Sequence, residues 1–554
     1  MKPTLGAALA TASVLVSLIS AVAQQPPQKP ANPPPADKLP MTGLSPSKLS
    51  PNLCLRKYRV STNSAECQAL FDQGLGYIYS YVWMEAARSF ETAKRHDPDC
   101  ALAWWGLSRA LQHWSRGDAN KALQKANELQ GRASDREQLL IKARMQERGL
   151  LPGVGNTREA RQKAAIDTLD HMLALYEDDQ EAWFYGGLLA CNGGLFGGDV
   201  RAVPFYKALL RVNPLHPGAN HELVHFYEGF QRPALGWPYA ENYIKSSPGI
   251  PHPFHMQAHL ATRLGRWHKT SDRSAHAIEL QRAYHKEMNV SPNEDHQFSH
   301  HLEILTVSLT HDGRFREAHA IKKEVEGYGW TLHLPWFRLR LAERNWSEAL
   351  KIVQHFRKFD KQTASYLAAL VYLKQGDCAR ATAEVEVLQQ AYRERKNNAE
   401  LEYRLWETQG LLMCRTAAAD AGLKLLAKAA DRSKNDYGHH SWGNGAYFME
   451  AWGCASLAAG KEDVAEEAFL EALAHDPGSV RGALGMQVLC ERHGRTEEAA
   501  RFAELAQRCW RRAEVGSFDA ELTALKTEHW PQRTQSTPRE SKALATEKKV
   551  EVSR

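Results

Sequence analysis

The stretch "CQALFDQGLGYIYSYVWMEAARSFETAKRHDP", from Cys67 to Pro98, decides the fold. Apolar residues recur in it every three or four positions, as they do on one face of a helix. Counted from Cys67, the residues that set the pattern are Leu70 at position 4, Gly74 at 8, Tyr77 at 11, Ala86 at 20, Phe90 at 24, Ala93 at 27 and Pro98 at 32. Small residues permit two helices to cross closely, large residues fill the adjacent space, and a proline ends the second helix. The stretch therefore predicts a pair of packed helices.

The same spacing returns near the other end of the chain. Counted from Ala446, it is met by Met449, Gly453, Ala465, Phe469, Ala472 and Pro477. This is the 34-residue helix-turn-helix code of the tetratricopeptide repeat. One such pair cannot bury its apolar face alone, so pairs stack into a superhelix. We therefore predict an all-α protein, a right-handed α-solenoid of tetratricopeptide-like repeats with roughly eight to ten helix pairs.

The N-terminus reads as a targeting segment. Lys2 is followed by a short, mainly apolar run from Leu5 to Ile19, and Ala21-Val22-Ala23 forms an A-x-A cleavage site. This arrangement is typical of a secretory signal peptide. We expect residues 1–23 to be removed after Ala23 and the mature protein to be periplasmic or secreted.

Composition divides the rest of the 554 residues. Residues 24–60 are Pro-rich and predict an extended linker, and residues 516–554 predict a polar, disordered tail. Between them we expect N-terminal repeats over 61–150, His-rich repeats over 151–327 and C-terminal repeats over 328–515. The net charge is only +6 and no basic stripe is visible, which argues against nucleic acid as a partner. No other apolar run is long enough to span a membrane after signal cleavage.

The stretch "HELVHFYE", from His221 to Glu228, opens with H-E-x-x-H. In metallopeptidases this motif supplies two zinc ligands and a glutamate that acts as general base. Glu222 would be the base here, and Glu241 is the candidate for a third ligand. Against this, the repeat frame accounts for His221 and His225 without any glutamate, and no strand is visible to hold a peptide substrate.

Half of the 24 histidines lie between His216 and His301. In a repeat that starts at Pro217, His221 and His225 occupy positions 5 and 9 of the first helix. In the repeat that starts at Pro251, the same positions hold His255 and His259. A start at Ser299 places His300 at position 2 and Glu303 at position 5. Positions 2, 5 and 9 face the concave groove, and residues four apart share one helix face, so these side chains should converge.

Neutral imidazoles are good ligands for zinc, copper, iron or nickel. We predict a candidate transition-metal site, such as a zinc site, formed by His221, His225, His255, His259 and His300. His216, His296 and Glu303 are further candidates. The alternative, which the sequence favours slightly, is that the histidines are packing and hydrogen-bonding residues of a polar groove.

Three blocks resemble exported bacterial tetratricopeptide proteins of uncharacterised function. The blocks are "NPLHPGANHELVHFYE", "PHPFHMQAHLATRLGRW" and "DHQFSHHLEILTVSLTHDGRFREA". The family carries similar H-P-G-A-x-H-x-x-x-H and H-M-x-x-H blocks. The resemblance implies the fold and the site residues His216, His221, His225, His255 and His259, with His296 or His300 as the last member. It implies no reaction.

Two functions follow from these patterns. The first is an exported binding or scaffold protein that takes a protein or peptide in its concave groove and has a His-rich patch able to bind a metal. The second is a metal-dependent hydrolase that uses Glu222 as base. The sequence favours a binding protein over an enzyme, without deciding between them.

Overall fold

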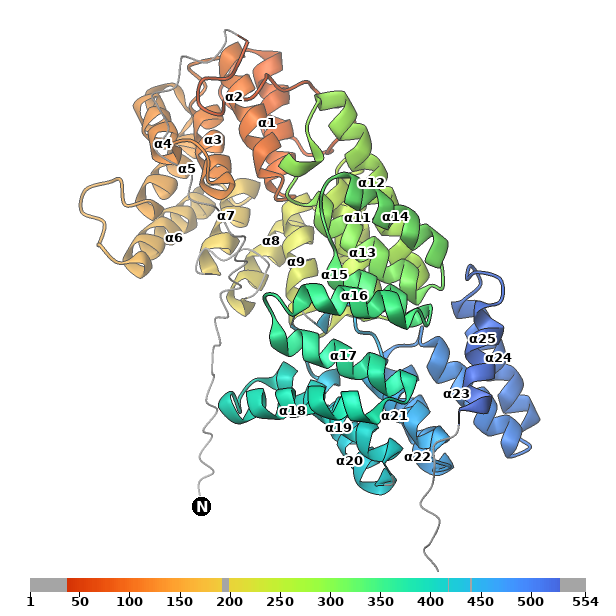
Figure 1. The fold of residues 1–554 in the computed structure, drawn as a ribbon. Helices are drawn as coiled ribbons and strands as arrows, with labels where there is room; N and C mark the ends of the chain where they lie inside the picture. The colour runs from red at the N-terminus through yellow and green to blue at the C-terminus, as the bar shows by residue number, and fades with distance from the viewer. Residues whose placement is uncertain (1–36, 192–198, 417, 439–440, 529–554) are drawn as a thin grey trace, which may run out of the picture.

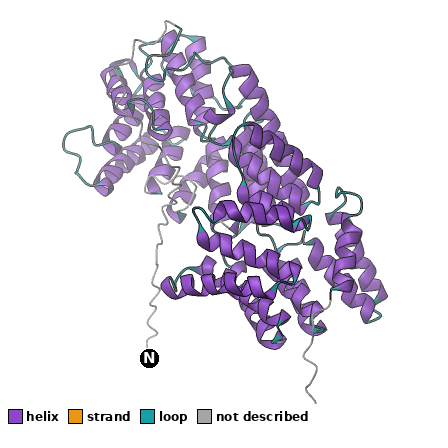
Figure 2. Ribbon diagram, viewed as in Figure 1, coloured by secondary structure: helices purple, strands orange, loops and turns teal. Residues whose placement is uncertain are grey.

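The computed structural model describes residues 37–191, 199–416, 418–438 and 441–528. In these ranges the regular structure consists of helices, and no strand occurs (Figure 2). The predicted signal peptide, residues 1–23, lies outside the described residues. No helix of the described ranges is long and apolar enough to cross a membrane.

The helices follow one another as packed pairs along a winding path (Figure 1). The first eight are α1 (Ala65–Ile78), α2 (Trp83–His96), α3 (Ala101–Trp114), α4 (Ala119–Glu128), α5 (Asp135–Glu147), α6 (Arg158–Leu175), α7 (Gln180–Ala190) and α8 (Val203–Val212). The central six are α9 (Pro217–Gly229), α10 (Pro233–Ser246), α11 (Pro251–Arg263), α12 (Trp267–Met288), α13 (Phe298–His311) and α14 (Phe315–Gly327).

The C-terminal half continues in the same manner. Its helices are α15 (His333–Ala342), α16 (Trp346–Phe356), α17 (Lys361–Gln375), α18 (Cys378–Glu394), α19 (Ala399–Arg415), α20 (Ala419–Lys434), α21 (Tyr447–Ala458), α22 (Glu462–His475), α23 (Val480–Arg492), α24 (Thr496–Cys509) and α25 (Ser517–Thr527). Short 3-10 turns are η1 (Gln130–Arg132), η2 (Val200–Ala202) and η3 (Pro292–Glu294). The described part thus forms the predicted all-α helical solenoid, with more pairs than the eight to ten expected.

The residues that set the repeat pattern pack as the pattern predicts. Phe90 is fully buried between α1 and α3, and a Cβ atom placed on Gly74 would lie 2.7 Å from its ring. A Cβ on Gly106 would overlap the other side of the ring. Phe469 is held in the same way between Gly453 and Gly485, at the opposite end of the chain. Glycine is needed at these positions because any side chain would push the paired helices apart.

The predicted N-terminal linker is wrong from residue 37 onwards. Leu39 is completely buried, and the backbone N–H groups of Met41 and Thr42 donate to the Glu91 carboxylate at 2.7 and 2.8 Å. An extended segment needs partners for its backbone donors, and side chains of the first repeat supply them. Residues 37–60 therefore belong to the folded unit.

The C-terminal repeats fold back onto the central ones. The indole N–H of Trp510 donates to the carbonyl of His311 at 2.7 Å, and Arg512 pairs with Asp312 at 2.8 Å. Helix α25 lies inside the stretch predicted as a polar tail, and its Leu525 is buried. The folded part therefore extends beyond the predicted boundary at residue 515. This return brings the loop before α21 against the central helices.

Candidate metal centre

Seven histidines of three neighbouring helices lie in one continuous row, which we call the histidine ladder. Helix α9 carries His221 and His225, α11 carries His252, His255 and His259, and α13 carries His300 and His301. Prolines at the starts of α9 and α11 fix where these helices begin, at the predicted Pro217 and Pro251. Because residues three and four apart share one helix face, α9 and α11 each direct their histidines to one side. His300 and His301 are adjacent on α13 and belong to different sets.

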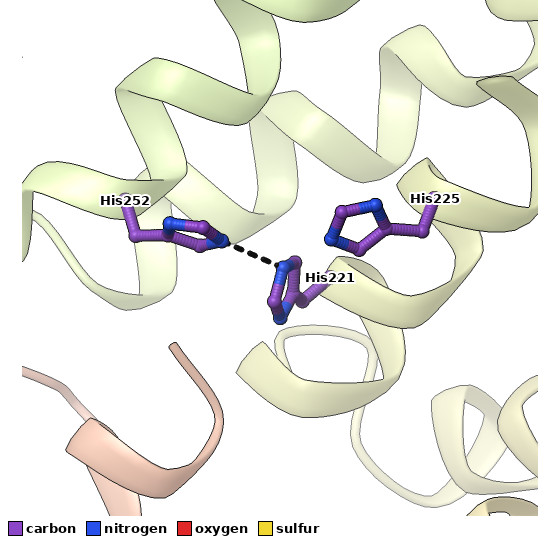
Figure 3. Close-up of side chains that lie close together, drawn as sticks. All are labelled: His221, His225 and His252. Atoms are coloured by element: carbon purple, nitrogen blue, oxygen red, sulfur yellow. Dashed lines mark hydrogen bonds between the residues drawn. The ribbon is translucent and has the colours of Figure 1, made fainter. Parts of the chain in front are cut away.

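The ladder divides into three sets of histidines. In each set, one ligand nitrogen per residue lies within 4.8 Å of the others. Set A is His221, His225 and His252, set B is His252, His255 and His301, and set C is His255, His259 and His300. Figure 3 shows the rings of set A turned toward one another from two helices. His252 and His255 are each shared by two sets.

Hydrogen bonds fix the tautomers in set A. The Tyr79 carbonyl can only accept, so Nδ1 of His221 carries the proton that bonds to it at 2.6 Å. Nε2 of His221 is then a bare lone pair, and it lies 2.9 Å from Nε2 of His252 (Figure 3). Nε2 of His252 must be the donor in that contact. Its Nδ1 is buried and has no hydrogen-bond partner among the described residues.

Hydrogen bonds also orient histidine rings in sets B and C. Nδ1 of His301 donates to the side-chain oxygen of Gln281 at 2.7 Å, which leaves Nε2 bare and, within the described ranges, without a partner. Nδ1 of His259 donates to the carboxylate of Glu228 at 3.1 Å, and its Nε2 lies 3.4 Å from Nε2 of His300. Metal-binding histidines usually donate their second N–H to a carboxylate or carbonyl in this way, which orients the ring and raises its basicity.

Burial keeps most of the ladder neutral. Loss of solvent lowers the pKa of His221, His252 and His255 well below 6.5, and neighbouring histidines lower it further. The same causes lower the pKa of His225 to about 4 and that of His301 to about 3. At neutral pH these rings therefore offer lone pairs rather than charges, as metal ligation requires.

Glu228 is the anion of the ladder. Burial alone would raise its pKa, but His259 and Arg263 beside it hold the pKa at about 2. The carboxylate is therefore ionised at neutral pH and can support a cation that binds at His259. Nothing in the repeat spacing singled out Glu228, Gln281 or the Tyr79 carbonyl, because they come from positions with no shared periodicity.

In the described part of the chain, three ring nitrogens of the ladder are buried without a hydrogen-bond partner. They are Nδ1 of His252, Nδ1 of His255 and Nε2 of His301; all three belong to set B, and sets A and C contain one each. A buried polar atom left unsatisfied costs about 1–3 kcal/mol. A cation bound between the rings would offset that cost. Within the described ranges Nε2 of His216, outside the ladder, is also buried without a partner, so the observation that favours a ligand is the grouping of three such atoms in one row.

The five histidines predicted as ligands all lie in the ladder. His252 and His301 were missed. His252 occupies position 2 of its repeat, which is a groove-facing position, so the frame contained a signal for it. His301 gives no such signal, because it falls at position 3 of the repeat that starts at Ser299, which is not a groove-facing position.

The further candidates lie elsewhere or in supporting positions. His216 is the N-cap of α9, where its Nδ1 accepts from the N–H of Ala219 at 3.2 Å. His296 is exposed and precedes α13, so it does not share a helix with His300. Glu303 pairs with His300 at 3.5 Å and supports that ring.

The histidines predicted to face the concave groove are covered in the structure. His221 is fully buried, and His252, His255, His259 and His301 are no more than 8% exposed. The ring of Tyr81, in the turn between α1 and α2, packs 4.5 Å from His221. The ring of Trp442, from the loop before α21, packs 5.1 Å from His259. These covers come from remote segments that the superhelix brings back over the ladder.

The H-E-x-x-H motif contributes both its histidines to set A. Glu222 is buried, and the hydroxyl of Tyr81 donates to its carboxylate. Glu241, predicted as a third ligand, is instead exposed on α10 and accepts from the indole N–H of Trp237 at 3.0 Å. The third member of the set is His252.

Comparisons with known proteins give no name for this arrangement. No family model and no curated protein matches the chain. Among solved structures, the chain is similar to a monomeric mutant of IFIT1 with Gppp-AAAA, at 14% identity over 81% of this chain and 91% of that chain. The TM-score is 0.26, so the fold assignment rests on the helix pairs of this chain and the site on its own geometry.

Proposed function

We propose that this protein is an exported helical-repeat binding protein that holds transition-metal ions on its histidine ladder. The observation that carries the proposal is the presence of three sets of histidines, each with buried nitrogens within 4.8 Å of one another. The hydrogen bonds from His221, His259 and His301 to fixed acceptors add to it, because they leave a lone pair available in every set.

The sharing of ligands sets the expected number of ions. Sets A and C have no histidine in common, whereas set B shares one residue with each. Two ions can therefore bind together at sets A and C. With ions at sets A and C, His301 of set B binds no ion. We expect two ions per chain at saturation.

The ligand type favours zinc, copper, nickel or iron over magnesium or calcium. All the ligand atoms are imidazole nitrogens, which suit these ions, while hard cations prefer oxygen. Two nitrogens bound to one tetrahedral zinc lie roughly 3.3 Å apart, since each is about 2.0–2.1 Å from the ion. The spacing of 3.4 Å between Nε2 of His259 and Nε2 of His300 in set C is close to that value. In set A the two Nε2 atoms lie 2.9 Å apart, and metal binding to both requires the proton of His252 to move to Nδ1.

The test is a cobalt titration of the untagged mature chain, residues 24–554, after removal of metal. Tetrahedral cobalt reports its own coordination by visible absorption. The wild type should bind two ions. His221→Ala/His225→Ala and His259→Ala/His300→Ala should each bind one, and His301→Ala should still bind two. Binding that is absent, or that is unchanged in both double variants, would overturn the proposal.

A metal-dependent hydrolase is the second candidate. The observation that favours it is that Glu222, between His221 and His225, accepts from Tyr81, whose ring packs against His221. If Glu222 acts as a general base, Glu222→Gln should abolish peptide hydrolysis and leave the metal bound. If the protein only binds metal, the same variant should keep its metal and no activity should be lost, because none is present.

The cellular setting and the partner are also proposals. The A-x-A site and apolar run of residues 1–23 support export to the periplasm or beyond. Stacked helical repeats present extended surfaces that bind proteins or peptides, which supports a scaffold role alongside metal binding. Detection of the chain from Gln24 in a periplasmic or culture fraction would test the first proposal.

A further inference from the structure

A cavity lies beside set C, between α13, α15 and the loop before α21. Its volume is about 120 Å³. One wall is apolar and is formed by Ile304, Val307 and Trp442. The polar groups that line it include His300 and Arg338. A metal ligand and a guanidinium thus line one small cavity.

Arg338 is a cation without a direct counter-ion. Its guanidinium lies 4.5 Å from the ring centre of Tyr447, and it interacts with Tyr366. Tyr366 in turn donates to Glu407 at 2.7 Å, so the phenol stands between that carboxylate and Arg338, although the charge of Glu407 still acts on the guanidinium. Across the part of the chain that the structure describes, Arg338 forms no ion pair with a carboxylate. A half-buried guanidinium is best satisfied by a bidentate carboxylate.

The other polar end of the cavity belongs to set C. Three histidines fill three positions of a tetrahedral ion and leave the fourth open. His300 lines the cavity and is the most exposed member of its set, so the open position can be reached from that side. An anionic oxygen is a natural fourth ligand for such an ion.

We propose that this cavity binds a small carboxylate carried on an apolar group. Arg338 holds the carboxylate, the wall that contains Trp442 takes the apolar part, and a metal ion at set C strengthens binding through its open position. Only the last of these three contacts rests on the proposed metal function.

One acidic residue of the cavity would repel a carboxylate ligand. Glu303 also lines the cavity, with its carboxylate 3.5 Å from the ring of His300. Neutralising Glu303 should therefore strengthen binding of an anion. Arg340, on the same helix as Arg338, pairs with Glu343 at 3.0 Å and does not line the cavity, so it offers a matched control.

The experiment is calorimetric titration of the mature chain with benzoate, and with benzamide as a neutral probe of the same shape. Benzoate should bind and benzamide should not. Arg338→Met should lower the affinity for benzoate at least about tenfold, while Arg340→Met leaves it unchanged. Glu303→Gln should raise it. If Arg338→Met fails to fold, Arg338→Lys, which keeps the charge but loses the fork, should still weaken binding.

Added zinc separates the two proposals. Zinc should raise the affinity for benzoate in the wild type, and His300→Ala should remove only that increase. If no metal binds but benzoate still depends on Arg338, the cavity is confirmed and the metal function fails. Equal binding of benzoate and benzamide, no binding of benzoate, or full binding by Arg338→Met would overturn the inference. Tighter binding of N-acetylphenylalanine than of benzoate would assign the carboxylate to a peptide C-terminus rather than to a free acid.

Discussion

The histidine ladder and the repeats of α21 to α24 follow the same repeat spacing but have different residues at equivalent positions. In α9 and α11, positions 5 and 9 of the repeat are histidines. In α21, position 5 is Glu450, which accepts from Ser479 at 2.7 Å and pairs with Arg481 at 3.4 Å. In α23 the equivalent positions are Leu484 and Val488, both buried.

This difference distinguishes residues that stack the helices from residues that could bind a ligand. The C-terminal repeats place apolar or fully partnered side chains at these positions, and this is sufficient to stack the helices. The ladder instead leaves Nδ1 of His252, Nδ1 of His255 and Nε2 of His301 buried without partners in the described residues. In the part of the chain that the structure describes, isolated buried polar atoms without partners also occur in the C-terminal repeats, at the indole nitrogen of Trp452 and at Oε1 of Gln487. Those of the ladder lie together on neighbouring imidazoles, and this grouping points to a ligand.

The largest expected effect is on packing, where the two regions should differ most. Phe469→Ala removes the ring held between Gly453 and Gly485 and should cost about 3–5 kcal/mol of stability. It should leave the number of bound metal ions unchanged. Urea unfolding followed by circular dichroism, with a metal assay on the folded variant, checks both parts. A loss of metal in folded Phe469→Ala would remove the distinction between the regions.

Metal binding should stabilise the wild type through the ladder alone. Zinc at one hundred times its dissociation constant should add about 2.7 kcal/mol to the free energy of unfolding for each site that it fills. His259→Gln/His300→Gln should gain less, because set C is lost. A control variant in the other region, Leu484→Ala, should keep the full gain despite its lower starting stability. The shift in thermal midpoint with zinc measures each gain, and equal gains in all three proteins would contradict the account.

The metal-free protein should lose stability in acid because of the ladder. The pKa values of His225 and His301 are about 4 and about 3 in the folded chain, against 6.5 for an ordinary histidine. Below pH 6.5 the unfolded chain therefore takes up more protons, and stability falls as the pH falls toward these values. We expect a loss of about 2 kcal/mol for each of the two histidines between pH 6.5 and pH 4.5 in chelator. His225→Gln/His301→Gln should flatten that slope, and an unchanged slope would be the contrary result.

The smallest expected effect is on zinc affinity, when the hydrogen-bond acceptor of one histidine ring is changed. Glu228→Gln replaces the ionised acceptor of His259 and should weaken zinc binding at set C about tenfold, or about 1.4 kcal/mol. Glu450→Gln, the matched change in the C-terminal region, should lower stability without changing zinc affinity. Competition against a chelating dye resolves a tenfold change. Equal affinity in Glu228→Gln and the wild type would show that the carboxylate does not act through the ring.

The repeat frame predicted the fold and most of the ladder. Gly74 and Phe90 defined a helix pair, Pro217 and Pro251 placed the starts of α9 and α11, and the four-residue spacing put His221 and His225 on one face. These are local signals, since each depends on residues within one or two helices. His252 was missed because only pairs four residues apart were considered.

The rest could not be predicted from local spacing. Tyr81 and Trp442 cover the two ends of the ladder from segments that are far from it in sequence. The return of the C-terminal repeats onto α13 depends on the pitch of the whole superhelix, which no single repeat encodes. The sequence therefore predicted that the histidines face a concave groove, but it gave no sign that remote segments would bury them.

The central claim is tested most directly by counting metal ions. The untagged chain from Gln24 would be loaded with zinc, freed of excess ion and analysed for metal per chain, beside His221→Ala/His225→Ala/His259→Ala/His300→Ala. The account predicts about two zinc ions in the wild type, as sets A and C allow, and fewer than one in the folded variant. No retained zinc in the wild type, or the same amount in both proteins, would contradict it and return the histidines to a packing role.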